Sequence, residues 1–430
     1  TSFNLTTYSL LSILKRMKSI CVFEDDSYRN FLPLAYNRPV YELRCGFYSF
    51  LERIALQYQD TEINLFCREY LKNLTAENYP HTVNKIEGDN NGCLFINGRL
   101  LLSAPIPITG KEEIGVIDNT IVYVRLNKEN SLSITPEKFL DKDFIHELKK
   151  DFNVKKLNVS LMQYPWDLIH ANKEQIASDF KSYIKDGSVR ESDHKGVHFI
   201  RGSQIYIGKN TTIKPGCVLD AEEGPIYIGD NVNISANSVV EGPVFIDDNV
   251  VIKALTRIHA GSNLGKVCKI GGEISNTIIQ DYTNKQHDGF LGDSYIGAWV
   301  NLGAGTVNSN LTNLYGSIKV QLSDKTIDTG QTFLGMIMGD HTKTAINTKF
   351  TTGSIIGFAC NILLTNTPPK FTPSFSWYSD NITRAYDVTR ELQVAKRMMA
   401  RRNKKMTRNG EKVFKAIFTL TETERKIHDN

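Results

Sequence analysis

The sequence predicts an α/β domain, a left-handed parallel β-helix and a basic helical tail, in that order along 430 residues. Three observations lead to this architecture. Strand-like and helix-like segments alternate through residues 17–190, aliphatic residues recur at every sixth position from residue 228, and residues 381–430 have high helix propensity. A chain of this length exceeds one typical hydrophobic core, so more than one domain is expected.

The six-residue period is the strongest of these signals. A branched aliphatic residue occupies every sixth position at Ile228, Ile234, Val240, Ile246, Ile252, Ile258, Leu264 and Ile270. This period fits neither an amphipathic helix, with 3.6 residues per turn, nor an alternating strand, with two. It is typical of a solenoid with triangular coils, in which each hexapeptide forms one side and its aliphatic residue points inward. Such coils are left-handed, an exception to the usual right-handed crossover between parallel strands.

The β-helix is expected over residues 191–380. The period resumes at Ile296 and again over residues 350–362. It breaks between Asn310 and Phe333, so a loop is expected to leave the coil there. In solenoids such insertions commonly line the binding face.

Residues 17–190 alternate between strand and helix patterns. The buried-strand runs SICVF, INLFC and CLFING are separated by helix-like segments such as CGFYSFLERIALQYQ, and VIDNTIVYVRL is a long strand or a hairpin. This order predicts an α/β domain with a largely parallel sheet. A polar linker is expected near residues 186–196. Residues 1–16 are interpreted as an upstream extension before a natural start at Met17.

Composition excludes several classes of protein. Basic and acidic residues nearly balance at 51 and 47, which makes no case for nucleic-acid binding. Seven scattered cysteines without a CxxC pair indicate the reduced thiols of a cytoplasmic protein. No apolar run approaches the roughly 20 residues of a membrane helix. The basic run 396–405 lacks interleaved aromatic residues, so we interpret it as a solvated helix face, and the tail as a cover for the open end of the coil.

One segment of the β-helix, residues 284–311, combines small residues with side chains that suit catalysis: NKQHDGFLGDSYIGAWVNLGAGTVNSNL. His287 supplies an imidazole, the side chain that most often acts as a general base near neutral pH. The alternative for His287 is a corner residue bonded to a neighbouring carbonyl. Asn301 and Asn310 supply neutral amides for sugar hydroxyls. Small residues would let a ligand approach the backbone closely, among them Gly303, Ala304 and Gly305.

This segment resembles the acetyltransferase half of the bifunctional N-acetylglucosamine-1-phosphate uridyltransferase/glucosamine-1-phosphate acetyltransferase family. The active-site motif of that family is H-x-x-Y-L-G-D, followed by N-x-G-A-G-T and an asparagine. The resemblance places His287 on the catalytic histidine and puts the substrate-binding positions at Arg257, Phe290, Asn301 and Asn310. Two positions depart from the family, because Ser275 replaces a phosphate-binding lysine and Leu311 replaces a tyrosine. Lys285 and Lys269 are the candidates to supply the lost charge.

A divergent branch of the same family matches the chain more closely. Its pattern is matched over residues 17–405 by FLPLAYNRPVYELRCG, LFINGRLL, YPWDL, GGEISN, NKQHDGFLG, NLGAGT, GMIMGDHTKTAINT and PSFSW. The resemblance implies a homotrimer that transfers an acyl group from acetyl-CoA to an amino-sugar phosphate such as glucosamine-1-phosphate. The pathway implied is nucleotide-sugar synthesis of the UDP-N-acetylglucosamine type, for the cell envelope. The CoA-binding positions would be Gly303, Ala304, Gly305 and His341, although a simple turn is an equal alternative for His341.

The resemblance also makes residues 17–190 a nucleotidyltransferase-like domain that would bind UTP or a UDP-sugar. The family opens this domain with a glycine-rich loop, but the loop here contains no glycine and leaves three phosphate-binding cations, Arg29, Arg38 and Arg44. Where the family carries Asn-Gly-Asp with a Mg²⁺-binding carboxylate, this chain has Asn97-Gly98-Arg99. Arg99 cannot ligate a cation, but it can hold a phosphate or a carboxylate. Asp167 is the candidate replacement metal ligand, or else it caps a helix that begins near Leu168.

Two functions from different classes follow. The first is an enzyme, a sugar-1-phosphate acyltransferase fused to a nucleotidyltransferase-like domain whose activity is in doubt. The second is a trimeric nucleotide-sugar-binding or scaffold protein that keeps the fold without catalysis. Acyl transfer is favoured, because a protein without that chemistry would have no need to keep the segment from His287 to Asn310. A modest alternative for the basic tail is that one of its cations meets the CoA 3′-phosphate across a subunit interface.

Overall fold

The computed structural model describes residues 19–86, 92–184, 194–322 and 325–428. The extension expected at residues 1–16 lies outside this range. By contacts the chain divides into two compact units. The first comprises residues up to 29, 38–43 and 49–163, and the second comprises residues 30–37, 44–48 and 164–430. Each unit is described by itself.

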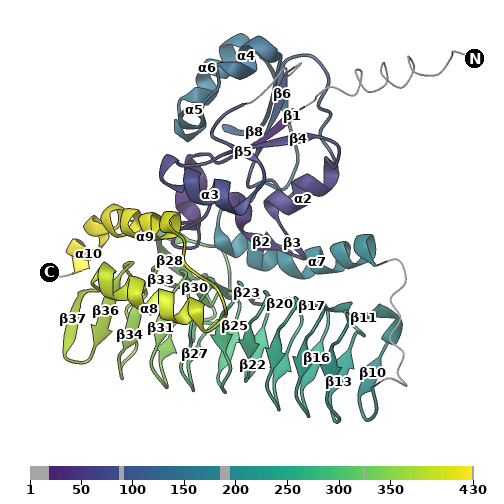
Figure 1. Cartoon of the computed structure of the whole chain (residues 1–430), viewed down its shortest axis with the longest axis vertical. Coiled ribbons are helices and arrows are strands. Elements are labelled where there is room, and N and C mark those ends of the chain that lie inside the picture. The colour runs from purple at the N-terminus through teal and green to yellow at the C-terminus, as the bar shows by residue number, and fades with distance from the viewer. Residues whose placement is uncertain (1–18, 87–91, 185–193, 323–324, 429–430) are drawn as a thin grey trace, which may run out of the picture. The chain divides into compact units, whose positions relative to one another are not determined.

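A mixed seven-stranded sheet forms the first unit (Figure 1). Its strands are β1 (Ser19–Phe23), β4 (Glu62–Phe66), β5 (Thr82–Val83), β6 (Cys93–Asn97), β7 (Glu113–Ile117), β8 (Thr120–Leu126) and β9 (Asn153–Lys156). The strand order is β5-β4-β1-β6-β8-β7-β9. The first four are parallel, β7 and β8 form an antiparallel hairpin, and β9 runs parallel to β7. The three strand runs expected from sequence are confirmed, and of the two options for the fourth run the hairpin is observed.

Aromatic packing shapes the carboxyl end of β1. The helices of this unit are α2 (Phe50–Gln57), α3 (Lys72–Asn78), α4 (Lys128–Leu132), α5 (Pro136–Leu140) and α6 (Phe144–Asp151). Phe139 of α5 stacks on Phe23 at the end of β1, with 3.7 Å between ring centroids, and Phe66 and Phe95 complete the cluster. All four rings are buried. This cluster fixes the strand end from which Asp25 and Asp26 follow.

The second unit contains the parallel β-helix that the hexapeptide period predicts, of the left-handed class. Its first sheet has strands β10 (His198–Ile200), β13 (Val218–Asp220), β16 (Val239–Glu241), β19 (Arg257–Ile258), β22 (Glu273–Ser275) and β25 (Phe290–Gly292). The second sheet has β11 (Ile205–Ile207), β14 (Ile226–Ile228), β17 (Val244–Ile246), β20 (Ser262–Leu264), β23 (Ile278–Ile279), β26 (Tyr295–Ile296), β30 (Met336–Met338), β33 (Ser354–Ile356) and β35 (Phe371–Thr372). The third face has β12 (Thr212–Ile213), β15 (Asn233–Ile234), β18 (Val251–Ile252), β21 (Lys269–Ile270) and β24 (Asn284–Lys285), and farther along β31 (Lys343–Thr344), β34 (Asn361–Leu363), β36 (Ser376–Ser379) and β37 (Ile382–Ala385).

The inward positions expected from the six-residue period are confirmed. Each of the eight aliphatic residues from Ile228 to Ile270 is at most 1% exposed. Equivalent positions of successive coils pair in register, as Ile234 does with Ile252 and Ile252 with Ile270. The core of the prism is therefore a set of aliphatic columns that run along its axis.

One corner of the coil changes character along its length. Residues with positive φ occupy this corner in successive coils, first Asn231 and Asn249, then Val267, Tyr282, Trp299 and His341. Asparagine adopts such angles readily, whereas bulky residues do so only where surrounding contacts compensate. Here the compensation is aromatic, because Tyr282 stacks on Trp299 at 4.2 Å between ring centroids and Trp299 stacks on His341 at 6.2 Å.

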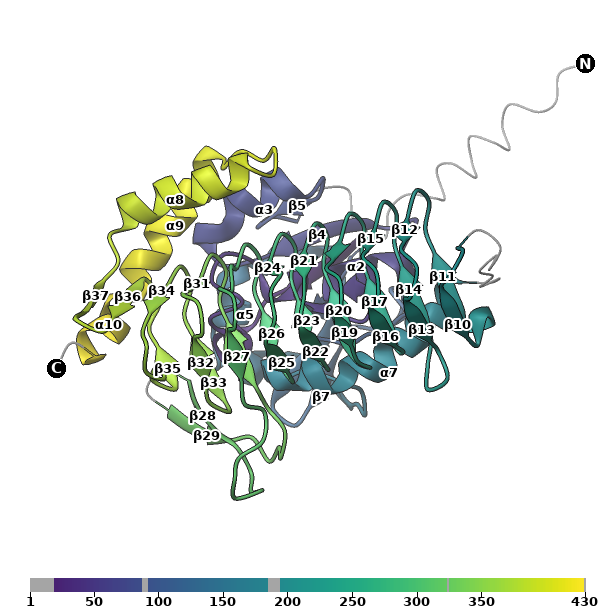
Figure 2. The same cartoon turned by 90° about the horizontal axis from the view of Figure 1, so that it is seen from below.

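The expected break in the period is a hairpin that leaves the coil (Figure 2). It is formed by β28 (Lys319–Leu322) and β29 (Lys325–Asp328), which pair antiparallel. The coil continues on either side, where β27 (Val307–Asn308) pairs with β32 (Lys349–Phe350) and β26 pairs with β30.

Helices complete the second unit. α7 (Pro165–Tyr183) packs against β17, β20 and β26, so its contacts lie with the coil, although the expected domain boundary was near residue 190. The tail forms α8 (Val388–Ala400), α9 (Arg408–Leu420) and α10 (Glu422–His428), which lie beside the last coils (Figures 1 and 2). Lys343 pairs with Glu391 of α8, and Arg425 of α10 donates to the Ser374 carbonyl at 3.3 Å. No helix in the described part of the chain is long and apolar enough to cross a membrane.

Candidate functional site

His287 lies at an exposed corner between two faces of the coil. β24 ends at Lys285, and β25 begins at Phe290, so His287 stands on the bend that joins the third sheet to the first. Gly289, at φ +129°, makes the turn, and a Cβ there would meet the Thr306 carbonyl at 2.2 Å. The His287 side chain is exposed to solvent on this tightly built backbone.

Phe290 and Asn310 come together beside Gly292. A Cβ at Gly292 would meet the end of the Phe290 ring at 2.4 Å and Nδ2 of Asn310 at 3.1 Å. The Asn310 amide donates to Asp293 Oδ2 at 2.6 Å, and Asn276 donates to Asp293 Oδ1 at 2.7 Å. Sequence reasoning missed Asp293, although it stands in the quoted L-G-D motif. Its carboxylate orients the Asn310 amide, because it receives the NH₂ group and turns the carbonyl oxygen elsewhere.

Arg257 lies in the same register column as Phe290. β19, β22 and β25 pair so that Arg257 is opposite Glu273, and Glu273 is opposite Phe290. Two strand spacings put the Arg257 and Phe290 backbones about 10 Å apart. The Arg257 guanidinium is 61% exposed and contacts Glu273 Oε2 at 2.5 Å. His259 joins this network through Glu241 at 2.5 Å and Glu273 at 3.5 Å. The acidic partner of Arg257, Glu273, was not expected.

Asn301 lies across the corner, on the third face. Its Oδ1 accepts a hydrogen bond from Nδ2 of Asn284 at 3.3 Å, and Arg402 donates to Oδ1 of Asn284 at 2.9 Å. Lys269, in register with Asn284, faces the same cations of the tail. Arg402, then burial, and then Lys253 and Arg401 lower the pKa of the Lys269 ammonium. The structure thus places positive charge on the Asn301 side of the corner.

Packing of the next coil explains why positions 303 and 305 are glycines. A Cβ at Gly303 would meet the Ala345 carbonyl at 2.4 Å, and one at Gly305 would meet Oδ1 of Asn347 at 2.1 Å. Gly305 also has φ +71°. The next coil occupies the space beside both glycines, so their size is explained by coil packing. A CoA contact at Gly303, Ala304 and Gly305 stays a prediction.

The surroundings of His341 favour a structural role in a turn over a role in binding CoA. Its side chain is 3% exposed, at φ +59°. Its ring meets Phe414 of α9 edge-on, with centroids 4.9 Å apart, and also contacts Trp299 and Phe358. The tail helices therefore cover this corner.

Lys285 points into the prism, away from solvent. It is 1% exposed, and its ammonium donates to the carbonyls of Gly271 and His287. Burial lowers the pKa of Lys285 to about 8, with Asp288 acting in the opposite direction. This geometry favours a structural role for Lys285 over direct contact with a sugar phosphate.

In the first unit, Arg99 holds a carboxylate, one of the two roles expected for it. Arg99 is fully buried, and it donates to Asp25 through Nε at 3.0 Å and Nη2 at 2.5 Å. It also donates to the Met162 carbonyl. Asn97 donates to Asp25 Oδ2 at 2.8 Å and accepts from the Arg99 amide at 3.0 Å. The Asn97-Gly98-Arg99 turn therefore encloses Asp25 in donors.

A cavity of about 200 Å³ opens beside this turn. Asp25, Asp26 and Phe139 line it together with residues of the β7–β8 turn. Asp26 is paired with Arg29 at 2.7 Å and with Lys142 at 3.3 Å. Among the described residues, no group of three or more His, Cys, Asp or Glu side chains could hold a metal ion.

Asp167 caps a helix. Its Oδ2 accepts from the Tyr164 amide at 2.9 Å, in a capping box at the start of α7, which begins at Pro165. This placement favours the capping alternative over a metal ligand. Asp167 is also grouped with the second unit, whereas Asp25 and Asp26 belong to the first.

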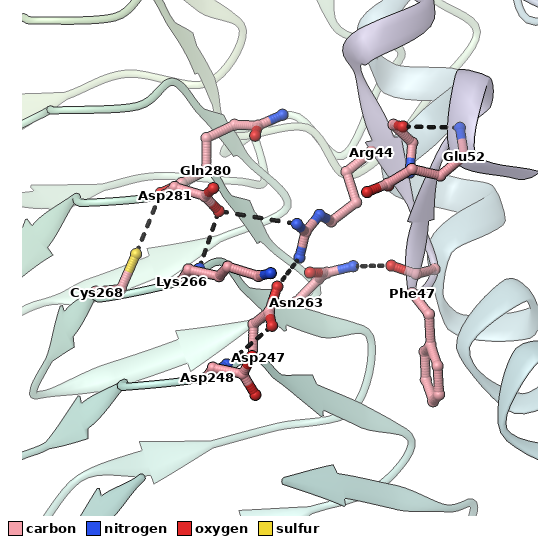
Figure 3. Close-up of polar contacts among 12 residues, drawn as sticks. Arg44, Phe47, Glu52, Asp247, Asp248, Asn263, Lys266, Cys268, Gln280 and Asp281 are labelled. Atoms are coloured by element: carbon pink, nitrogen blue, oxygen red, sulfur yellow. Dashed lines mark hydrogen bonds and ion pairs between the residues drawn. The ribbon is translucent and has the colours of Figure 1, made fainter. Parts of the chain in front are cut away.

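The three predicted phosphate-binding arginines have different surroundings. Arg44 is held by carboxylates of the coil, with Nη1 at 2.7 Å from Asp247 Oδ2 and Nη2 at 3.8 Å from Asp281 Oδ1 (Figure 3). Its guanidinium lies over the Phe245 ring, and the residue attaches segment 44–48 to the β-helix. The Arg38 carbonyl accepts a hydrogen bond from Nη2 of the Arg68 side chain at 2.7 Å, and the Arg29 side chain is 63% exposed. Phosphate binding by Arg29 and Arg38 stays a prediction, and the ion pairs of Arg44 favour a structural role.

Comparison with known proteins shows what the chain is similar to. Residues 20–188 match the family described as sugar nucleotidyl transferase. The bifunctional protein GlmU of Thermodesulfovibrio yellowstonii is 30% identical over 221 residues, which cover 46% of each chain. GlmU of Methanococcus aeolicus is 31% identical over 236 residues, covering 52% of this chain and 50% of that one. The chain is thus similar to the bifunctional GlmU proteins over about half of its length. It spans about half the length of the curated relatives it matches.

A shorter match has a name that states both chemistries. The bifunctional sugar-1-phosphate nucleotidylyltransferase/acetyltransferase of Sulfurisphaera tokodaii is 36% identical over 91 residues, 21% of this chain and 23% of that one. Among solved structures, the UDP-N-acetylglucosamine acyltransferase of Campylobacter jejuni aligns with 11% identity over 52% of this chain and 94% of that chain, at a TM-score of 0.26. The AntD N-acyltransferase of Bacillus cereus aligns with 14% identity over 47% and 86%, at a TM-score of 0.18. Likenesses this small support no conclusion about function.

Proposed function

We propose that the β-helix transfers an acyl group from acetyl-CoA to the amine of an amino-sugar phosphate such as glucosamine-1-phosphate. The observation that carries the proposal is the placement of His287. It stands exposed on a glycine-built corner, with Phe290 and Asn310 on one adjoining face and Asn301 on the other. A general base must be free to reach a substrate proton, and a sugar needs neutral amides close to that base.

The chemistry is a direct transfer. The amine nitrogen attacks the thioester carbonyl carbon while His287 accepts the proton that the amine loses. Backbone N–H groups of the coil stabilise the tetrahedral oxyanion. The carbon–sulfur bond then breaks, and the thiolate of CoA leaves and is protonated. Arg257, in the Phe290 column, would orient the sugar phosphate through charge-assisted hydrogen bonds that replace its contact with Glu273.

Thiol release from acetyl-CoA in the presence of glucosamine-1-phosphate tests this proposal. His287→Ala should remove turnover, whereas His198→Ala, an exposed histidine in the first coil strand, should leave it unchanged. Equal turnover in His287→Ala and the parent protein would rule out the proposed base. Calorimetry with acetyl-CoA separates this function from the non-catalytic scaffold alternative, because a scaffold without this chemistry has no need to bind the acyl donor.

A second candidate function concerns the first unit, which we propose binds a nucleotide or UDP-sugar without efficient nucleotidyl transfer. The buried pair of Arg99 and Asp25 favours this candidate. Phosphoryl chemistry of this kind needs Mg²⁺ held by carboxylates, and here the most buried candidate carboxylate is already neutralised by an arginine. Equilibrium binding of UTP and of UDP-N-acetylglucosamine, measured with and without Mg²⁺, tests it.

For assembly we propose a homotrimer with parallel coil axes, in which His287 of one chain faces the CoA site of a neighbour. A prism buries its own core but leaves flat outer faces, and a cleft between two such faces would exclude water from the transfer. Light scattering at micromolar concentration tests this arrangement, and a monomer would contradict it.

A further inference from the structure

A lysine occupies a position that belongs to the hydrophobic interior of the coil. Ile234, Ile252 and Ile270 pair in register with one another, and Lys285 continues the same column. The three isoleucines are fully buried, and Lys285 is 1% exposed. Strand register thus puts residue 285 at an inward position that the preceding coils fill with isoleucine, and the chain places an ammonium group there.

The ammonium joins the corners of two neighbouring coils. Lys285 Nζ donates to the Gly271 carbonyl at 3.1 Å and to the His287 carbonyl. A backbone hydrogen bond joins the same two coils in the opposite direction, because the Gly271 amide donates to the Lys285 carbonyl at 2.6 Å. The two coils approach each other closely at Gly271, where a Cβ would lie only 2.6 Å from the Gln286 carbonyl oxygen. The lysine therefore binds the His287 corner from inside the prism.

The stability of the coil does not require this lysine. A buried ammonium loses its hydration, and its two carbonyl partners are neutral. Burial accordingly lowers the pKa of Lys285, against a smaller opposite effect of Asp288. An isoleucine would fill the column without that cost, as it does in the three preceding coils. Local departures from an otherwise consistent pattern are typical of functional positions.

The corner that Lys285 binds carries the proposed base. Within the described residues, the His287 ring has no hydrogen bond, ion pair or ring contact, whereas its carbonyl accepts from Lys285. The direction of the imidazole therefore depends on the backbone of residues 286–289. The Asp288 carbonyl accepts from the Gly305 amide at 3.1 Å and the Gly289 carbonyl accepts from the Glu273 amide at 3.2 Å, and Lys285 adds the hydrogen bond at His287 itself.

We propose that Lys285 is a positioning residue for His287: its ammonium holds the corner backbone from the interior, so that the imidazole faces the substrate amine. This inference rests on the proposed acyl transfer. It assigns to Lys285 a role distinct from binding the sugar phosphate, because the ammonium faces away from solvent.

Lys285→Met tests the proposal, because methionine fills the column but cannot donate a hydrogen bond. We expect the melting temperature to stay equal or to rise, kcat to fall by about 10- to 100-fold, and the KM for the sugar phosphate to change by less than about twofold. Lys285→Arg, which keeps the donors, should regain part of the lost kcat. Ile270→Met, at the same position one coil earlier, is the matched control and should leave kcat unchanged.

A measurement on the histidine itself separates this inference from the proposed function. Modification of His287 by diethyl pyrocarbonate, followed by peptide mass mapping with His198 as internal reference, reports the environment of the ring without any turnover. We expect the ratio of the two modification rates to change in Lys285→Met and not in Ile270→Met. An unchanged ratio together with unchanged kcat would overturn the positioning role. If the parent protein shows no acyl transfer, the proposed function fails, but the modification ratio still decides whether Lys285 positions His287.

Discussion

Arg99 and Asp25 form a two-point ion pair inside the first unit, with Nε–Oδ1 at 3.0 Å and Nη2–Oδ2 at 2.5 Å. The arginine is fully buried, and the Asp25 side chain is 15% exposed. The family resemblance of the sequence implies a Mg²⁺-binding carboxylate at the position of Arg99. Here Arg99 neutralises Asp25, the acid that borders the cavity. The arrangement of charge at the end of β1 is therefore the reverse of that in a metal site, where carboxylates face a cation.

The first prediction concerns the stability of this pair. Asp25→Ala leaves a buried guanidinium without its counter-charge, so we expect a loss of about 3 kcal/mol or more in the free energy of unfolding. Asp26→Ala, at a neighbouring acid whose partner Arg29 is exposed, is the control and should cost less than about 1 kcal/mol. Urea denaturation followed by circular dichroism measures both. Equal costs for the two variants would contradict the view of Arg99–Asp25 as a buried structural pair.

The second prediction concerns catalysis in the first unit. Mg²⁺-dependent release of pyrophosphate from UTP and a sugar-1-phosphate should be weak or absent, because Asp25 is bound to Arg99 and Asp167 caps α7. A coupled pyrophosphate assay over several nucleotides checks this expectation. Robust transfer that survives alanine at Asp25, Asp26 and Asp167 would show that the metal site lies elsewhere. Strong transfer that is lost in Asp167→Ala would instead assign the metal to that residue.

The third prediction follows from the pKa of Lys285, which burial lowers to about 8. An unfolded lysine titrates near 10.4. Below pH 8 the amine is charged in both states, and the folded protein carries the whole cost of the buried charge. Between pH 8 and about 10.4 the folded protein releases its proton while the unfolded chain keeps its own, so stability from this group rises with pH. The rise should be on the order of 3 kcal/mol.

Denaturant unfolding of the parent protein and Lys285→Met at pH 7, 8, 9 and 10 measures this effect. The difference between the two proteins removes the contribution of every other titrating group. The stability advantage of Lys285→Met should be largest at pH 7 and should shrink toward pH 10. A difference that stays constant with pH would show that the ammonium is not desolvated in the folded state.

The fourth prediction concerns the cysteines. All seven are free and buried, and burial raises the pKa of the thiols of Cys67, Cys93 and Cys360 to about 12. Only the thiolate reacts readily with disulfide reagents. Titration with Ellman's reagent at pH 8 should therefore detect no fast-reacting thiol in the folded protein and seven after denaturation. Fast reaction in the folded state would reveal local opening around one of these residues.

Several features of this protein could be predicted from the sequence because their signals are local and repeated. The six-residue period requires one inward aliphatic residue per hexapeptide, and coils that stack in register bury all eight of those residues. The break in the period after Asn310 likewise locates the β28–β29 hairpin. The segment around His287 stands out because glycines and polar residues replace the usual pattern within one or two coils.

Other features were decided only by the tertiary structure, because they depend on contacts between distant parts of the chain. Arg44 and Asp247 are 203 residues apart, and Arg99 and Asp25 are 74 apart, so no spacing in the sequence reveals that each arginine already has a carboxylate partner. Lys285 gives the clearest case. The sequence indicates a lysine near the site, whereas strand register alone places its ammonium inside the prism. A side chain in a strand points to one face or the other with a period of two, and only the pairing of coils decides which face is the interior.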